Sequence, residues 1–151
     1  MAKTISKDTP LNEITLRRYE KPNLKDRDLV RKLCLTVGLL QPGDGRDVIV
    51  DIMLVLLQAN KDKRALTSDE IQAKVIESRK SASCEEKGIA ESNIRRQLKR
   101  LRDIMLVEKS ENKYRIAEFE SLSNVFDEKI TNFLVPSITA RIKEYLKELE
   151  K

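Results

Sequence analysis

The sequence contains no histidine and no tryptophan, and only two cysteines among its 151 residues. Without histidine, the chain lacks the commonest general base and the commonest metal ligand of enzymes. Cys34 and Cys84 stand alone, without the spacing of a metal site or of a disulfide framework, and this fits a reducing compartment. The sequence also has no nucleophile elbow and no dinucleotide-binding fingerprint. We therefore expect no catalytic residue, no metal site and no cofactor, and we expect that the protein is not an enzyme.

Long apolar runs and phosphate-binding loops are missing as well. The most apolar stretch, residues 48–57, carries Asp51 and has about half the length that a membrane-spanning helix needs. Residues 1–9 are too polar for a signal peptide. Residues 41–45 hold two glycines without the Gly-Lys-Ser/Thr ending of a phosphate loop, so we interpret them as a turn. These features predict a cytoplasmic protein that does not bind membranes.

What the chain has in abundance is charge. Charged residues make up 36% of the sequence and hydrophobic residues 40%, so a core can form beneath an ionic surface. The net charge is +5, and it is unevenly distributed: residues 89–116 hold eight basic and four acidic residues, whereas residues 118–151 hold five basic and seven acidic ones. Concentrated positive charge is what a nucleic-acid-binding surface requires. A scattered ionic surface of the kind found in heat-adapted proteins is the alternative.

Residues 89–116 combine two hydrophobic periods. The first is helical, and its apolar members are Ile94, Leu98, Leu101 and Met105. At about 100° per residue these four side chains share one stripe, which we expect to face a core. The other face is polar and mostly cationic, with Ser92, Asn93, Arg95, Arg96, Lys99, Arg100 and Asp103. A face of this kind can reach phosphates and base edges.

After Met105 the apolar period changes to two. Val107 alternates with polar neighbours, and so do Tyr114 and Ile116, around the turn-forming residues 110–112. The pattern predicts a β-hairpin with Tyr114 and Ile116 on its buried face. Lys113 and Arg115 are then expected on the solvent side, beside the helix.

Across these residues the chain resembles the winged helix-turn-helix superfamily, as found in prokaryotic or archaeal DNA-binding transcription regulators. In that family the third helix typically runs into an L-R/E-x-x-G-L-V-E segment and a short basic wing, which residues 101–108 (LRDIMLVE) and 113–116 (KYRI) match. Met105 replaces the glycine that often ends this helix in a left-handed conformation, and Ala90 replaces the usual Ser or Thr cap. We therefore expect a different helix end, and a start that Ser92 caps. The resemblance covers about residues 45–117.

The N-terminal part is expected to supply an arm and one helix. Residues 1–22 form the predicted arm, in which residues 14–17 alternate like a strand; the arm either packs on the domain or is a flexible basic extension. A helix over residues 24–37 is predicted by its cap Asn23 and its stop Gly38. Its apolar stripe consists of Leu29, Val30, Leu33 and Val37, with Cys34 at the edge.

Two further helices are predicted before the cationic one. Residues 48–57 are apolar nearly all round, as in a buried central helix, where Asp51 must reach solvent or a cation. Thr67 and Glu70 have the spacing of a capping box that begins the next helix. Residues 77–88 either continue that helix or form a charged loop. Within them, Cys84 is either a redox-sensitive thiol or a bystander.

Residues 118–151 are expected to form a C-terminal helical extension with two apolar stripes. The first contains Phe119, Leu122, Phe126, Ile130 and Phe133, and the second contains Ile138, Ile142, Tyr145 and Leu149. Pro136 separates or kinks the two helices. The second stripe has the 4-3-4 spacing of a coiled-coil seam. Both helices either pack on their own domain or join two copies as a homodimer, with recognition helices about one DNA turn apart.

The predicted fold is therefore mainly α with a small β-hairpin wing: a winged helix-turn-helix domain over residues 23–117, flanked by the arm and the C-terminal extension. The resemblance implies a double-stranded DNA-binding transcription regulator, with helix 90–105 in the major groove and wing 106–116 on the backbone. The candidate DNA-binding residues are Ser92, Asn93, Arg95, Arg96, Lys99, Arg100, Lys113 and Arg115. The alternative is a winged-helix protein–protein interaction module without direct DNA binding, which Asp103, Glu108 and Glu111 favour because they would repel phosphate.

Overall fold

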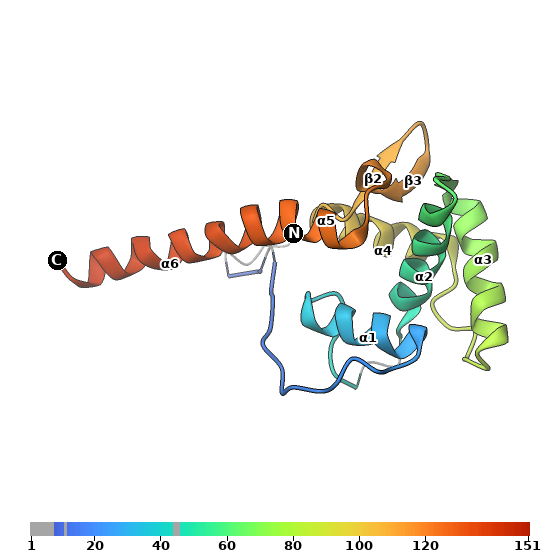
Figure 1. Ribbon diagram of the computed structural model, residues 1–151, viewed down its shortest axis with the longest axis horizontal. Coiled ribbons are helices and arrows are strands. Elements are labelled where there is room, and N and C mark those ends of the chain that lie inside the picture. Colours follow the sequence, from blue (N-terminus) through green and yellow to red (C-terminus); the bar gives the residue numbers. More distant parts are fainter. Residues whose placement is uncertain (1–7, 11, 44–45) are drawn as a thin grey trace, which may run out of the picture.

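A computed structural model describes residues 8–10, 12–43 and 46–151 of the chain. Its elements in chain order are α1 (Asp26–Thr36), α2 (Val48–Lys61), β1 (Leu66–Thr67), α3 (Ser68–Ser81), α4 (Glu91–Asp103), β2 (Val107–Ser110), β3 (Lys113–Ile116), the 3-10 turn η1 (Ala117–Phe119), α5 (Leu122–Phe126), the π-helical η2 (Asp127–Leu134) and α6 (Val135–Leu149). The fold is mainly helical with a small antiparallel sheet, as predicted (Figure 1). Among the described residues, no helix combines the length and the apolar character needed to span a membrane.

Helix α2 is the centre of the core. Nine of its fourteen residues are buried. Helices α1, α3 and α4 and strand β3 all pack against it (Figure 1). A helix that is apolar nearly all round is stable in water only when neighbours cover its sides. The prediction of a buried central helix at residues 48–57 is therefore confirmed.

Strand β3 is the middle strand of the sheet, which has the order β1-β3-β2. Val107 of β2 lies opposite Ile116, and Leu66 of β1 lies opposite Tyr114, in antiparallel pairs. Tyr114 and Ile116 are buried, so the predicted hairpin and its inner face are confirmed. Strand β1 was not predicted, because two residues are too few to show an alternation.

The turn between β2 and β3 consists of two residues with left-handed backbones. Glu111 and Asn112 have φ values of 51° and 62°. Two successive positive φ values define the type I′ turn, whose twist matches that of the flanking strands. This turn fixes the register of the hairpin and therefore places Lys113 on its outer side.

Helix α1 differs from its prediction at its start and on its buried face. Its N-cap residue is Lys25 rather than Asn23. Leu29 is 41% exposed, whereas Cys34 is completely buried. The face that meets α2 is set by Val30, Cys34 and Val37, which recur at i, i+4 and i+7, so the true stripe is rotated toward Cys34.

The N-terminal arm packs against the end of α1 as irregular backbone. The Thr15 N–H donates to the Thr36 carbonyl at 2.9 Å, and the Arg17 guanidinium donates to the Leu35 carbonyl at 3.4 Å. The strand proposed at residues 14–17 is therefore wrong, although Ile14 does pack on the core. Residues 1–7 and 11 of the predicted arm, and residues 44–45 of the predicted turn, lie outside the described residues.

Helix α3 begins with the predicted capping box. The Thr67 hydroxyl accepts from the Glu70 N–H at 3.2 Å, and the Glu70 carboxylate accepts from the Thr67 N–H at 3.2 Å. The helix continues to Ser81, and residues 82–90 then lead to α4. Residues 77–81 therefore continue the helix, as one interpretation predicted, and residues 82–88 form a loop, as the other predicted.

Helix α4 ends at a residue with a left-handed backbone, Met105, whose φ is 64°. Glycine is the usual residue at such a position. The Met105 N–H donates to the Arg102 carbonyl at 2.9 Å, and the Leu106 N–H donates to the Leu101 carbonyl at 3.2 Å. This is a Schellman motif. The expectation of a different helix end is therefore wrong, because these two bonds offset the strain of a non-glycine residue. The start also differs, since the N-cap is Ala90 and not Ser92.

The chain stays helical from Leu122 to Leu149. At the two joints, Asp127 has φ −60° and ψ −46°, and Val135 has φ −62° and ψ −48°, which are helical values. Pro136 stands in the first turn of α6, a position that tolerates proline. The sequence pattern suggested that Pro136 separates or kinks two helices, but it does not separate them.

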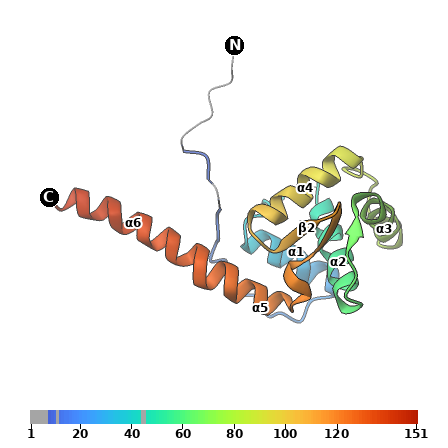
Figure 2. The ribbon, with the colours of Figure 1, turned by 90° about the horizontal axis from the view of Figure 1, so that it is seen from above.

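The two halves of this C-terminal helix have different surroundings. Val125 of α5 and Ile130 of η2 are buried in the core. Every residue of α6 is exposed, and the helix projects from the body of the molecule as a rod (Figures 1 and 2). The interpretation in which both helices pack on their own domain is therefore wrong for α6.

Candidate nucleic-acid interface

Helix α4 turns an apolar side to the core and a cationic side to solvent. Ile94, Leu98 and Leu101 are completely buried, and Met105 lies beyond the helix end. Because these residues recur every three or four positions, the opposite side of the helix is free of core contacts. The exposed polar residues of the helix are Ser92, Arg95, Arg96, Lys99, Arg102 and Asp103.

The exposed cations of α4 are held by weak contacts within the same helix. Arg95 forms an ion pair with Glu91, and Lys99 Nζ lies 3.1 Å from an Asp103 carboxylate oxygen. Such solvent-exposed pairs contribute about 0 to 1 kcal/mol. Because the pairs are weak, they leave both cations available to an anionic partner such as a phosphate, which binds them through charge-assisted hydrogen bonds.

The Asn93 side chain is half-buried and bound to groups of its own domain. Its side-chain amide donates to the Gly88 carbonyl at 2.7 Å, and its oxygen accepts from Arg96 at 2.8 Å and from Gln97 at 3.2 Å. Gly88 has φ +76°, and a Cβ added there would lie 3.1 Å from the Asn93 nitrogen. Asn93 therefore fastens the loop before α4 to the helix, and it orients Arg96.

Arg100 also faces the protein. It is half-buried and donates to Gln97 at 2.8 Å and to the Gly38 carbonyl at 3.5 Å. It lines a groove of about 340 Å³ together with Glu13 and Asp103, between the N-terminal arm and the end of α4. The sequence could not show this contact, because Gly38 lies 62 positions earlier in the chain.

The hairpin adds a second group of cations beside α4. Helix α4 and strand β2 are packed against each other (Figure 2). Lys113 is exposed, as expected. Arg115 is half-buried: its guanidinium lies 3.1 Å from the Glu108 carboxylate and 4.7 Å from the centre of the Phe119 ring. Arg115 therefore links the hairpin to η1 and is only partly open to solvent.

Two exposed cations of this surface were missed. Arg102 lies on the flank of the buried stripe of α4, and the helix leaves that flank open. Lys109 is exposed on β2, with its ammonium 5.5 Å from the centre of the Tyr114 ring. Arg102 was not predicted as a DNA-binding residue, because a helical projection places it close to the apolar stripe.

No protein-family model, curated protein or solved structure matches this chain. The functional assignment therefore rests on the geometry of its own surface.

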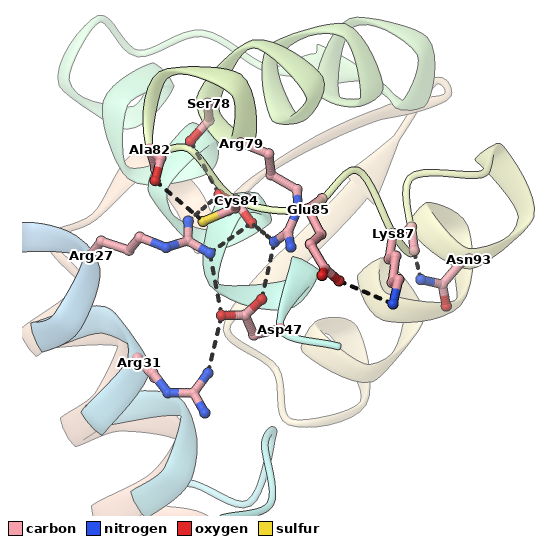
Figure 3. Close-up of polar contacts among 12 residues, drawn as sticks. Arg27, Arg31, Asp47, Ser78, Arg79, Ala82, Cys84, Glu85, Lys87 and Asn93 are labelled. Carbon is pink, nitrogen blue, oxygen red and sulfur yellow. Dashed lines mark hydrogen bonds and ion pairs between the residues drawn. The ribbon is translucent and has the colours of Figure 1, made fainter. Parts of the chain in front are cut away.

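A buried ionic cluster joins α1, α2 and α3 (Figure 3). The Asp51 carboxylate is completely buried and accepts from Arg79 at 2.7 Å, from Ser78 at 3.2 Å and from Arg27 at 3.2 Å. Of the two alternatives expected for Asp51, solvent or a cation, the structure shows the cation. A buried carboxylate whose oxygens are bound by two arginines has a structural role, because its lone pairs are occupied.

Asp47 extends the cluster toward the surface. It accepts from Arg79 and Arg31, each at 3.0 Å, and from Arg27 at 3.3 Å (Figure 3). Burial alone would raise the pKa of Asp47. The hydrogen bond from Arg79 and the positive charges of the three arginines outweigh burial, so the pKa lies below its usual range.

The cluster also reaches the connection between α3 and α4. The Arg79 Nε donates to the Glu85 carbonyl at 2.7 Å, and the Cys84 sulfur lies 3.7 Å from the Ala82 carbonyl oxygen (Figure 3). The cluster thus fixes the path of the chain that leads to α4. In the part of the chain that the structure describes, no group of three or more possible ligands could hold a metal ion.

Proposed function

We propose that the protein binds double-stranded DNA through α4 and the β2–β3 hairpin, as a transcription regulator of the winged helix-turn-helix type. In this proposal α2, α3 and α4 are the three helices of the domain, α4 is the recognition helix and the hairpin is the wing. The succession of three helices and a hairpin, with α4 exposed along one side, supports this assignment.

The observation that carries the proposal is the exposed cationic side of α4, together with the exposed Lys109 and Lys113 on the hairpin whose strand β2 packs against α4. The major groove of DNA is wide enough to admit an α-helix, whose side chains then reach base edges and flanking phosphates. The cations suited to this contact are Arg95, Arg96, Lys99 and Arg102, with Lys109 and Lys113 on the neighbouring backbone. Ser92 would add a shorter contact near the start of α4.

Binding of this kind depends steeply on salt. Each phosphate that a protein neutralises adds about −0.9 to the slope of log K against log salt concentration. Six cations in contact therefore give a slope of about −5. Asn93, Arg100 and Arg115 contribute by positioning, since their side chains bind protein groups.

The test compares two variants that remove the same charge from different helices. Fluorescence anisotropy with a labelled duplex, at several salt concentrations, is measured for wild type, for Arg96→Gln/Lys99→Gln on α4 and for Lys143→Gln/Lys147→Gln on α6. The α4 variant is expected to bind at least about tenfold more weakly and to have a salt slope smaller by about 2. The α6 variant should keep the wild-type slope.

Two outcomes contradict the proposal. One is no binding even at low salt, and the other is an equal loss of affinity in both variants. The second outcome would mean that net charge, rather than the surface of α4, causes the binding.

In the same proposal two copies of the chain associate as a homodimer through their C-terminal helices. The supporting observation is that α6 projects from the body with its apolar side exposed. A dimer would present two copies of α4 to one DNA molecule.

The alternative function is a protein–protein interaction module without direct DNA binding. The exposed carboxylate of Asp103 on the outer side of α4, and the acidic Glu111 at the tip of the hairpin, favour it because they repel phosphate. A protein that forms dimers and binds no duplex at low salt would match this alternative.

A further inference from the structure

The apolar side of α6 is exposed in the described part of the chain. Its exposed residues include Ile138, Ile142, Tyr145 and Leu149, whose exposed fractions range from 38% to 81%. Their 4-3-4 spacing places Ile142 and Leu149 at a positions, and Ile138 and Tyr145 at d positions, of a heptad. A seam of this kind is buried by a second helix.

We propose that α6 pairs with α6 of a second copy in antiparallel orientation. In the proposed register, Ile138 lies opposite the partner's Leu149, and Ile142 lies opposite the partner's Tyr145. Each a position then meets a d position of the other helix. This inference deepens the homodimer proposed above and rests on it, but it does not depend on DNA binding.

The charges that flank the seam select this orientation. Arg141 and Glu148 occupy successive g positions, and in an antiparallel pair g positions face each other. Arg141 therefore faces the partner's Glu148, and the twofold symmetry of the dimer repeats the pair on the other side. In a parallel pair, a g position faces an e position of the next heptad. Arg141 would then face the partner's Leu146, and no ion pair would form.

The side chains of Arg141 and Glu148 can both leave their present contacts and form ion pairs across the seam. Within its own helix, Arg141 Nε lies 3.5 Å from Glu144, and Glu148 lies 2.8 Å from Lys151 Nζ. All four side chains are about 70% exposed, so these contacts within one helix are weak. Pairing across the seam would replace them with partly desolvated ion pairs.

A groove at the base of α6 fits the end of the partner helix. Its volume is about 380 Å³, and it lies between Asn12 of the N-terminal arm and Leu134, Ile138 and Ile142. In the antiparallel register, the partner's Leu149 is the apolar residue that comes opposite Ile138. The groove therefore receives the most exposed apolar residue of α6. Arg141 lines the same groove, and in the proposed register the partner's Glu148 comes next to it.

The orientation determines the shape of the dimer. The twofold axis crosses the paired helices between residues 143 and 144. At about 1.5 Å per residue, the two copies of Val135, where α6 leaves the body, are about 25 Å apart along the rod. The two bodies thus lie at opposite ends of the paired helices.

The test uses charge reversal and its rescue in a mixture. Sedimentation equilibrium without DNA is measured for wild type, Arg141→Glu, Glu148→Arg, an equimolar mixture of these two variants, and the control Lys143→Glu. Each reversal at position 141 or 148 should weaken dimerisation at least about tenfold, because two like-charge pairs replace two ion pairs. The mixture should restore it, since the heterodimer regains both ion pairs, and the control should leave it unchanged.

Rescue in the mixture separates pairing between helices from an effect on one helix. A substitution that only lowered the helicity of α6 could not be repaired by another variant chain. In a Cys84→Ser background, Leu149→Cys should form a disulfide with Ile138→Cys when the two chains are mixed, but not with itself. Disulfide formation by Leu149→Cys alone would mean a parallel pair and would overturn the inference.

The remaining outcomes are also decisive. Wild-type protein that stays monomeric at about 100 µM, far above a dissociation constant of about 1 µM, would overturn both the homodimer and this inference. The anisotropy experiment would still decide DNA binding. A wild-type dimer that both Arg141→Glu and Glu148→Arg leave unchanged would keep the homodimer and overturn the antiparallel register.

Discussion

Asp51 shows how a single residue connects three helices. Its carboxylate has no exposed surface, and a buried charge costs several kcal/mol unless it is paired. Arg27 of α1 and Arg79 of α3 supply that pairing from the two helices on either side of α2. The relative positions of these helices are thus tied to one another by charge as well as by apolar packing.

Removal of one partner from this cluster should be costly. Arg79→Met keeps most of the side-chain volume but leaves Asp51 and Asp47 with fewer cations, so we expect a loss of about 3 to 5 kcal/mol in the free energy of unfolding. Urea denaturation measures this loss. Arg95→Met on the exposed side of α4 is the matched control and should cost less than about 1 kcal/mol. Equal losses in the two variants would show that the cluster does not stabilise the fold.

Asp47 should make the free energy of unfolding depend on pH in the acidic range. Its pKa is lowered in the folded protein relative to the ordinary value of 3.8. The stability that it contributes is therefore present above the unfolded value and is lost as the pH falls through the lower, folded value. We expect wild type to lose more free energy of unfolding between about pH 5 and pH 2.5 than Asp47→Asn does. Parallel curves from urea denaturation at several pH values would contradict this.

Gly38 joins two elements, helix α1 and the N-terminal arm. Its φ is +81°, and a Cβ at this position would come within 2.2 Å of the backbone oxygen of Glu13. Because that oxygen belongs to the backbone, it cannot move without shifting the arm. The glycine thus ends the helix and also allows the arm to lie against it.

A comparison of two glycines tests this junction. Gly38→Ala must accommodate both the left-handed backbone and the contact with Glu13. Gly43→Ala meets only the first problem, since its φ is +76° and nothing lies within 4 Å among the described residues. We expect about 1 to 2 kcal/mol of destabilisation for Gly43→Ala and clearly more for Gly38→Ala. Thermal or urea unfolding of both variants would show the difference, and equal effects would contradict the close approach of the arm.

The helices and strands that could be predicted are those whose sequence patterns involve only neighbouring residues. The capping box at Thr67, the apolar helix α2 and the alternation in the β2–β3 hairpin depend on residues close together in the sequence. The buried face of α1 could not be predicted, because it depends on where α2 lies. The same holds for β1, which becomes a strand only by pairing with β3 almost fifty residues later.

Only those parts of the candidate surface that depend on local periodicity could be predicted. Periodicity placed Arg95, Arg96 and Lys99 on the outer side of α4, where the structure has them. It could not show that Arg100 reaches the Gly38 carbonyl, or that Arg115 pairs with Glu108 across the hairpin. Those contacts depend on how separate elements pack, which no helical projection contains.

At the scale of the whole molecule, two surfaces lie on different parts of the chain. The cationic side of α4 belongs to the packed body, and the apolar side of α6 belongs to the projecting rod (Figure 2). In the two proposals above, one surface binds DNA and the other binds a second copy. The first of these two contacts is the central claim.

The most direct measurement is a titration of the ¹⁵N-labelled full chain with a short duplex, followed by the shifts of its backbone amide signals. We predict that the largest changes fall in α4 and the β2–β3 hairpin, around Arg96, Lys99 and Lys113, and that added salt reverses them. Changes confined to α6, or no change at low salt, would contradict DNA binding through α4.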